Sequence, residues 1–214
     1  MIYERYATLR HFDNLMLVMD LLICSATELE SHLLRPHAEV LVTGVGSVNA
    51  AYALTRFLER HDVRRIVVCG IGGAYRGSGL TIGDVVCAGS ECYGDLGVES
   101  PQGFLDLRAL GFATSSEFPM QIFPHARRAR FVTVNTCTGV DSLALTMERR
   151  TGGAVESMEG AAFAHVAGLF SIEIGEIRGI SNFTGNRDLS TWRVKEAADA
   201  AQLALIEWIG KISQ

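Results

Sequence analysis

Six short apolar runs, rich in Val, Ile and other strand-forming residues, recur along the 214-residue chain, with helical stretches between several of them. The runs cover residues 20–26, 38–46, 65–73, 83–90, 130–136 and 172–181. This alternation is typical of a mainly parallel sheet covered by helices on both faces. Because the length suits one domain with a substantial core, we predict a single α/β domain.

The connecting segments divide into helices and one irregular stretch. Helices are predicted over residues 47–61, over 160–170, which is apolar on all sides and therefore buried, and at the C-terminus. The last helix carries a one-faced apolar stripe formed by Val194, Ala198, Ala201, Leu205, Trp208 and Ile212. Glycines and prolines interrupt residues 91–129, so we expect a loop-rich insertion near the site.

Charge and composition exclude several function classes. The formal net charge is −5 and no block of like charges occurs, so we expect neither nucleic-acid nor membrane binding. The five cysteines form no CxxC pair, which favours reduced thiols in a cytoplasmic protein. The six histidines show no ligand spacing, and we expect no metal site and no cofactor. Small molecules or copies of the chain remain as partners.

The N-terminal stretch carries charged residues before any apolar run, which fits neither a signal peptide nor a membrane span. Met16 or Met19 is an equally acceptable start, because the first strand follows at once. We therefore predict an N-terminal extension over residues 1–15 and a domain over 16–214.

Glycine-rich and polar stretches follow the predicted strands, at the strand ends where α/β sheets bind ligands. GVGSVNAA (44–51) invites a dinucleotide-binding interpretation, but Asn49 occupies the third glycine position and the next strand ends without an acidic residue. A tight turn that needs small residues explains it equally well. GIGGAYRGSG (70–79) is predicted to be a loop that either contacts a ligand or simply turns.

Carboxylates lie in two further stretches of this kind. AVESMEGAAFA (154–164) contains Glu156 and Glu159 before the apolar helix, and ATELES (26–31) contains Glu28 and Glu30. Such residues in a first helical turn can simply complement the helix dipole. Glu159, however, precedes a helix with little polar surface, so we expect it to face a cleft where it can accept hydrogen bonds from a sugar diol.

Taken in this order, the stretches resemble the nucleoside phosphorylase and nucleosidase superfamily, and within it they are most similar to the futalosine hydrolases. The resemblance runs from about residue 20 to 212, and its most specific parts are ESMEGAAFA (156–164) and RGISNFTGNRD (178–188). ATELE, GIGGAY and residues 83–99 support it. It implies a mixed, partly closed central sheet flanked by helices, cleavage of a purine N-glycosidic bond, and assembly into homo-oligomers.

The resemblance also implies roles for particular residues. Glu30 matches the carboxylate that orients or deprotonates the attacking water, Glu159 the one that holds ribose hydroxyls, and Met158 the residue packed under the sugar. Substrate-binding positions are expected also at Gly72, Gly73 and Ser181. In the menaquinone route through futalosine, such an enzyme releases hypoxanthine and leaves dehypoxanthinyl futalosine.

The polar residues after the last strand bear on the choice of base and substrate. Adenosine-type nucleosidases have Asp at the position of Asn182. The amide can donate to a 6-oxo group while its carbonyl accepts from a protonated N7, which favours hypoxanthine. Asp188 is a hypothesised proton source, with a structural pair or helix cap as the alternative. Arg187 either binds the benzoate of futalosine or pairs with Asp188.

Three other functions remain open at this stage. A 6-oxopurine nucleoside phosphorylase is disfavoured, because Val68 stands where hexameric phosphorylases have Arg. A methylthioadenosine or adenosylhomocysteine nucleosidase is disfavoured by Asn182. A non-catalytic nucleoside-binding protein is disfavoured by the two glutamates. Residues 135–142 lack the aromatic that relatives stack on the base, so Phe183 or residues 91–112 are the candidates for stacking.

Overall fold

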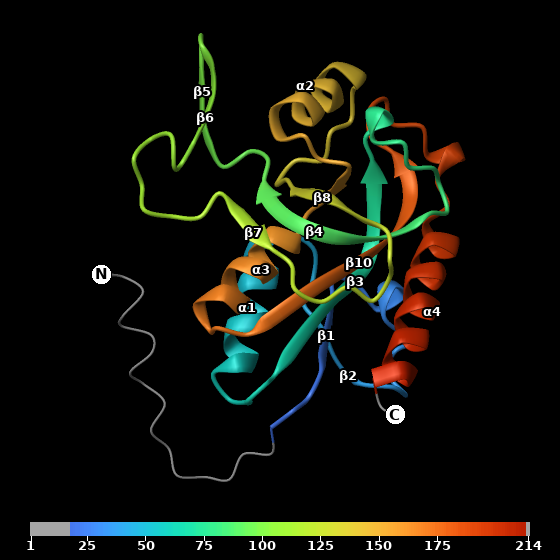
Figure 1. Cartoon of the computed structure of the whole chain (residues 1–214). Helices are drawn as coiled ribbons and strands as arrows, with labels where there is room; N and C mark the ends of the chain where they lie inside the picture. The colour runs from blue at the N-terminus through green and yellow to red at the C-terminus, as the bar shows by residue number, and fades with distance from the viewer. Residues whose placement is uncertain (1–17, 213–214) are drawn as a thin grey trace.

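The computed structural model describes residues 18–212, so the predicted extension at residues 1–15 lies outside the described residues. Its centre is an eight-stranded mixed sheet (Figure 1). The strands are β1 (Leu22–Ser25), β2 (Glu39–Val42), β3 (Arg65–Ala74), β4 (Val85–Tyr93), β7 (Glu117–Pro119), β8 (Arg128–Thr133), β9 (Val155–Ser157) and β10 (Glu173–Phe183). Six of them begin within three residues of the predicted apolar runs, because buried strands consist of such runs.

Part of the sheet closes on itself. Neighbours follow the order β10-β4-β8-β9-β3, and β10 also pairs with β3, so these five strands form a ring. β1 and β2 extend the sheet beyond β3. β10 runs parallel to β3 and antiparallel to β4, while β9 is antiparallel to β3 and parallel to β8. The expected mixed, partly closed sheet is thereby confirmed.

Glycines in β3 let the ring close tightly. A Cβ on Gly72 would lie 2.5 Å from Val155 Cγ1 on β9, and one on Gly70 would lie 2.6 Å from Glu30 Oε1. The prediction of a loop over residues 70–79 was therefore wrong for its first half, since the strand continues to Ala74. These glycines admit side chains from neighbouring elements instead of forming a turn.

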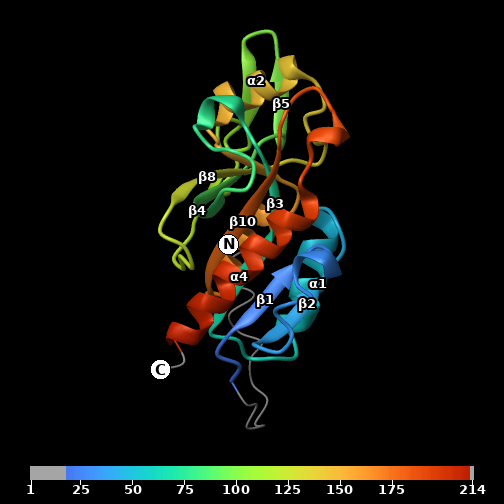
Figure 2. The ribbon, with the colours of Figure 1, turned by 90° about the vertical axis from the view of Figure 1, so that its right-hand side faces the viewer.

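Helices cover the sheet on both sides. α4 (Val194–Ile212) packs on β10 and β3, whereas α3 (Gly160–Leu169) and α1 (Ser47–Leu58) pack together on the opposite side (Figures 1 and 2). Contact with α4 is close at Gly179, where a Cβ would lie 2.0 Å from the carbonyl oxygen of Ala197. Seven of the ten residues of α3 are buried, as its uniformly apolar sequence predicts. The helix α2 (Asp141–Thr151) was not predicted.

The predicted insertion contains more regular structure than expected. Residues 97–106 form a hairpin of β5 (Gly97–Ser100) and β6 (Gly103–Asp106) that projects from the barrel (Figure 1). All five cysteines are free, and four are buried. Within residues 18–212, no helix combines the length and the apolar character needed to cross a membrane.

Candidate active site

A cavity of about 310 Å³ lies at the carboxyl ends of β1, β3 and β10. Most of its walls come from five segments far apart in the sequence, around residues 26–30, 71–73, 137–139, 156–159 and 178–187, and Val45, Trp192 and Val194 complete them. The predicted site residues that line it are Glu30, Gly72, Gly73, Met158, Glu159, Ser181, Asn182 and Arg187. Asp188 is not among the lining residues. The strand ends thus bring together nearly all the residues that the sequence singled out.

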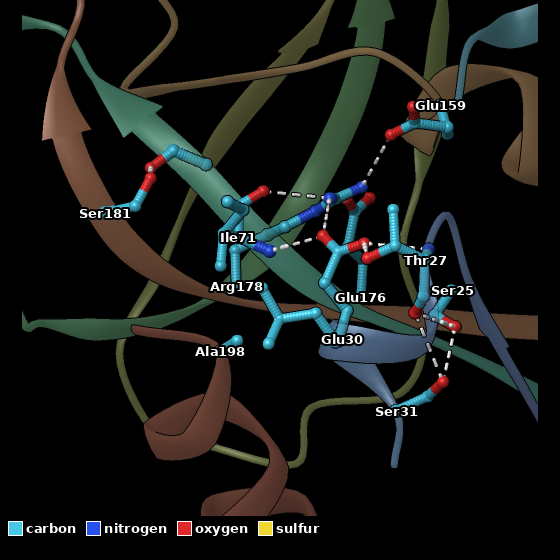
Figure 3. A network of polar contacts seen from close by, with 12 residues as sticks. Ser25, Thr27, Glu30, Ser31, Ile71, Glu159, Glu176, Arg178, Ser181 and Ala198 are labelled. Atoms are coloured by element: carbon cyan, nitrogen blue, oxygen red, sulfur yellow. Dashed lines mark hydrogen bonds and ion pairs between the residues drawn. The ribbon is translucent and has the colours of Figure 1, made fainter. Parts of the chain in front are cut away.

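Glu30 is held at the cavity by the short helix that follows β1. Its Oε2 accepts hydrogen bonds from the backbone N–H and the hydroxyl of Thr27, at 3.0 and 2.8 Å, and its Oε1 accepts one from the N–H of Ile71 at 3.0 Å (Figure 3). The side chain is buried, whereas Glu28 on the same helix is exposed and pairs with Arg35. Of the two carboxylates, only Glu30 lines the cavity.

Glu159 is held by the GVGS loop that precedes α1. The N–H of Gly46 donates to Glu159 Oε1 at 2.8 Å, and the Ser47 hydroxyl donates to the carbonyl of Met158 at 3.1 Å. Gly46 has a φ of 98°, a backbone conformation that side chains disfavour. Burial raises the pKa of Glu159 above its ordinary value of 4.5, although Arg178 and the Gly46 N–H oppose the rise. The glycines of this loop thus orient a carboxylate.

Arg178, which the sequence analysis did not single out, connects the two carboxylates. Its side chain is 3% exposed, with Nη1 3.9 Å from Glu30 Oε1 and Nη2 3.7 Å from Glu159 Oε2 (Figure 3). Its Nε donates to Glu176 at 2.7 Å and its Nη1 to the carbonyl of Ile71 at 2.9 Å. Burial by itself would lower its pKa, but the three glutamates raise it, so the guanidinium stays charged.

A sequence signal for Arg178 existed. Glu176 and Arg178 are two residues apart in a strand, and side chains at that spacing point to the same face. An opposite-charge pair on one face of an otherwise apolar strand indicates a buried ion pair, since unpaired charges are rarely buried.

Glu156 has a different environment from Glu159. It accepts a hydrogen bond from the Tyr75 hydroxyl at 2.8 Å, and two more from the backbone and hydroxyl of Thr138, at 2.9 and 2.8 Å. These bonds fasten the loop after β8 to the cavity wall. Its role in the structure is to hold that loop.

A β-bulge turns both Ser181 and Asn182 toward the cavity. Consecutive residues of a regular strand point to opposite faces, but the register between β10 and β3 shifts between Ile180 and Asn182. The Ser181 hydroxyl donates to Asn182 Oδ1 at 2.7 Å, and Asn182 Nδ2 donates to the carbonyl of Phe183 at 3.0 Å. The amide is thereby oriented, with one of its two N–H hydrogens used.

Arg187 and Asp188, which follow β10, have different surroundings. Arg187 lines the cavity with its guanidinium over the Trp192 ring, 4.9 Å from the centroid. The exposed Asp188 accepts hydrogen bonds from the backbone and hydroxyl of Ser190, at 3.0 and 2.6 Å, and caps the short helix Leu189–Thr191. Those bonds lower the pKa of Asp188. Among the described residues, the two side chains therefore have separate partners, Trp192 for Arg187 and Ser190 for Asp188.

Of the two stacking candidates, Phe183 lines the cavity and residues 91–112 do not. Within residues 18–212, no part of the 91–129 stretch contributes to the wall, so the expectation of an insertion near the site was wrong. β4, which leads into the hairpin, contributes no residue to the cavity wall either. The guanidinium of Arg76 lies over the Phe183 ring, 5.3 Å from its centroid.

Solved structures share this fold. The methylthioadenosine/adenosylhomocysteine nucleosidase of Colwellia psychrerythraea, in complex with adenine, superposes with a TM-score of 0.78 at 20% identity, covering 92% of this chain and 96% of that one. The corresponding enzyme of Neisseria meningitidis, in complex with methylthio-immucillin-A, gives 0.79 at 17% identity, covering 91% and 100%.

Sequence comparison identifies the family of the chain, which the shared fold alone does not. The model of the phosphorylase superfamily matches residues 33–209. The futalosine hydrolase of Thermus thermophilus is 34% identical over 77% of this chain and 78% of its own length, and that of Acidothermus cellulolyticus is 37% identical over 75% and 70%. With an identity above 30% over this extent and a ring-closed fold that matches, the chain belongs to the phosphorylase superfamily and, within it, to the futalosine hydrolases.

Proposed function

We propose that this protein hydrolyses the N-glycosidic bond of futalosine and releases hypoxanthine and dehypoxanthinyl futalosine, on the menaquinone route through futalosine. Its relatives named futalosine hydrolase support the substrate. The observation that carries the reaction is that one cavity has both the buried carboxylates Glu30 and Glu159 and the oriented amide of Asn182 in its walls.

Glu30 is the proposed base for the attacking water. Departure of the purine leaves a sugar that resembles an oxocarbenium ion, so a carboxylate both activates water and stabilises positive charge. Glu159 is proposed to accept hydrogen bonds from the ribose hydroxyls, and Met158 to pack under the sugar. Arg178 holds both carboxylates close together, because it is the cation that faces each of them.

Asn182 is proposed to recognise hypoxanthine. Its unused N–H hydrogen can donate to the 6-oxo group, while its oxygen, which already accepts from Ser181, can accept from a protonated N7. Adenine would leave buried polar atoms unpaired, at about 1–3 kcal/mol per group, which amounts to about tenfold discrimination or more. Because the Asp188 carboxylate is bonded to Ser190, we assign the N7 proton to a water molecule.

Arg187 and Trp192 are proposed to bind the benzoate of futalosine. A guanidinium can bind a carboxylate bidentately, and an aromatic ring can pack against the benzoate ring. Both side chains line the cavity, and Asp188 does not occupy the guanidinium. Arg187→Ala should therefore reduce the preference for futalosine over inosine; an unchanged ratio of the two kcat/KM values would contradict this role.

We infer further that the protein is a cytoplasmic homo-oligomer. Val48 and Tyr52 on α1 are 81% and 67% exposed, and Val45, just before the helix, both lines the cavity and is 52% exposed. Exposed apolar residues of this kind favour contact with another copy of the chain. Free thiols are typical of proteins kept in the reducing cytoplasm.

The test is to incubate the purified protein with futalosine, inosine and methylthioadenosine, with and without phosphate, and to follow the free base by chromatography. We expect hypoxanthine from futalosine alone, independent of phosphate. Phosphate-dependent cleavage of inosine would make the protein a phosphorylase, and adenine from methylthioadenosine would make it an adenosine-type nucleosidase.

A matched pair of variants tests the catalytic role of Glu30. Glu30→Gln should keep futalosine binding and lower kcat by about 10²- to 10⁴-fold, the usual contribution of general acid–base catalysis. Glu28→Gln on the same short helix should keep full turnover, because Glu28 is exposed and pairs with Arg35. Full turnover in Glu30→Gln would remove Glu30 from the mechanism.

A further inference from the structure

Two glutamates that the proposed mechanism does not use are completely buried behind the cavity, Glu91 on β4 and Glu176 on β10. One oxygen of each has a partner. Glu91 Oε2 accepts from the Thr133 hydroxyl at 3.0 Å, and Glu176 Oε1 accepts from Arg178 Nε at 2.7 Å. Among the described residues, the remaining oxygens, Glu91 Oε1 and Glu176 Oε2, have no N–H or hydroxyl donor.

The two unpartnered oxygens face the same small space beside Gly160. A Cβ at Gly160 would lie 2.0 Å from Glu91 Oε1 and 2.5 Å from Glu176 Oε2, so only a glycine admits both carboxyl groups there. Two ionised carboxylates in contact and out of water repel each other strongly. A single proton between them turns that repulsion into a hydrogen bond and gives both oxygens a partner.

The charges around the pair also call for one proton. Arg178 is the cation next to Glu176, and its far side already faces Glu30 and Glu159 at 3.9 and 3.7 Å. With every carboxyl ionised, four buried negative charges would surround one guanidinium. The other titratable groups near the pair are Cys69 on β3 and Cys87, Cys92 and Tyr93 on β4, and burial raises the pKa of each, so they stay neutral.

We propose that Glu91 and Glu176 share one proton and act as a single monoanionic positioning group, which holds Arg178 between the two cavity glutamates. In the resting arrangement Glu91 carries the proton and donates it to Glu176 Oε2, and Glu176 accepts the Arg178 Nε–H. Arg178 is thereby held from behind with one negative charge, while its two terminal nitrogens face Glu30 and Glu159. This role in catalysis rests on the proposed function; the shared proton does not.

The electrostatics of Glu91 agree with this assignment. Burial raises its pKa well above the ordinary value of 4.5, and the charge of Glu176 and a hydrogen bond to that residue raise it further, whereas Arg178 and Thr133 oppose the rise. Because its pKa is higher in the folded chain, Glu91 binds a proton more strongly there than in the unfolded chain. Folding takes up a proton, so stability from this group decreases as pH rises from 4.5 toward the folded pKa.

Infrared spectroscopy of the ligand-free protein tests the shared proton without any substrate. We expect the carbonyl stretch of a buried protonated carboxyl group at neutral pH, and its loss in both Glu91→Gln and Glu176→Gln, because an amide N–H replaces the shared proton. Glu117→Gln, on the strand paired with β4 at Glu91, is the control and should keep the band. Absence of the band from the native protein would overturn the proposal.

Denaturant unfolding supplies a second, independent measurement. At pH values between the unfolded and the folded pKa of Glu91, the folding equilibrium constant of the native protein relative to Glu91→Gln should fall as pH rises. The slope approaches about tenfold per pH unit, the effect of one proton taken up on folding. Parallel pH dependences would contradict a protonated Glu91. If Glu91→Gln does not fold, the native protein is compared with Glu176→Gln instead, because Glu91 is expected to be ionised beside the amide of that variant.

Kinetics test the positioning role. In Glu176→Gln the negative charge lies on Glu91, which does not contact Arg178 Nε. This variant should lower kcat by about tenfold or more, with a smaller change in KM. Glu91→Gln keeps a charged Glu176. Its loss of kcat should therefore be smaller than that of Glu176→Gln, by a factor of about ten or more. If both variants lose the same factor of kcat and the native protein has the infrared band, the shared proton stands and the positioning role is rejected. An inactive native protein that still has the band would contradict the proposed function alone.

Discussion

Glu156 and Glu159 are three residues apart, both line the cavity and both are buried, but their environments differ. Glu156 accepts three hydrogen bonds from Tyr75 and Thr138, whereas Glu159 accepts one, from Gly46, and has its other oxygen 3.7 Å from a guanidinium. A carboxylate has about four acceptor positions, so Glu159 keeps most of its capacity for a ligand. The number of internal hydrogen bonds, and not burial, distinguishes the structural carboxylate from the proposed binding one.

The largest expected effect is on the less-bonded glutamate. Glu159→Gln removes the negative charge that is proposed to hold the ribose hydroxyls and stabilise the oxocarbenium-like state, so kcat/KM for futalosine should fall by about 10²- to 10³-fold. Steady-state kinetics measure the change, and circular dichroism checks that the fold is kept. Activity within threefold of the native enzyme would mean that the free oxygen of Glu159 has no function in binding.

The pH profile extends this prediction. Because burial raises the pKa of Glu159, its carboxylate forms only above the ordinary value of 4.5, and the acidic limb of log kcat/KM should lie above that value. The value of kcat/KM should therefore fall as pH falls. In Glu159→Gln the residual activity should lack this limb; an unchanged limb would assign it to another group.

The next effect concerns the single hydrogen bond of Glu159. Gly46→Ala places a side chain at a φ of 98° and should cost about 1–3 kcal/mol of stability, and it should also lower kcat/KM because the N–H that orients Glu159 moves. Gly79→Ala is the matched control: its φ is 69° and no atom lies within 4 Å of the added Cβ. We expect Gly79→Ala to lower stability but not kcat/KM. Equal kinetic losses would contradict a specific role for Gly46.

A smaller effect is expected for the well-bonded glutamate. Tyr75→Phe removes one of three donors to Glu156, and a hydrogen bond to a charged group contributes about 1.5–3 kcal/mol, so the free energy of unfolding should fall by about that amount. Turnover at saturating futalosine should stay close to the native value. Denaturant unfolding and kinetics on the same sample separate the two; a large loss of kcat with unchanged stability would reverse our comparison of Glu156 and Glu159.

The smallest effect is predicted for Asp188. Asp188→Asn keeps an N-cap side chain that can accept from Ser190, and the residue does not line the cavity. Turnover and its pH dependence should therefore match those of the native enzyme. A tenfold loss of kcat with a displaced alkaline limb would instead support Asp188 as the source of the N7 proton.

Much of the fold could be predicted because its signals are local. β-branched runs specify buried strands, and the apolar residues 160–170 specify a buried helix, since burial on every side requires an apolar surface on every side. The structure of residues 91–129 and the role of the glycines in β3 were harder to predict from the sequence. A glycine that admits a neighbouring side chain has the same sequence appearance as a glycine in a turn.

By itself, the sequence determined the α/β class, the family and the stretches that supply most of the cavity wall, because strand ends and short motifs are encoded by neighbouring residues. Only the tertiary structure decided the ring closure between β3 and β10, the bulge that turns Ser181 and Asn182 to one side, and the position of Arg178 among Glu30, Glu159 and Glu176. These features depend on contacts between residues far apart in the chain. The charge and hydrogen bonding of each glutamate follow from those contacts, and residue type alone cannot specify them.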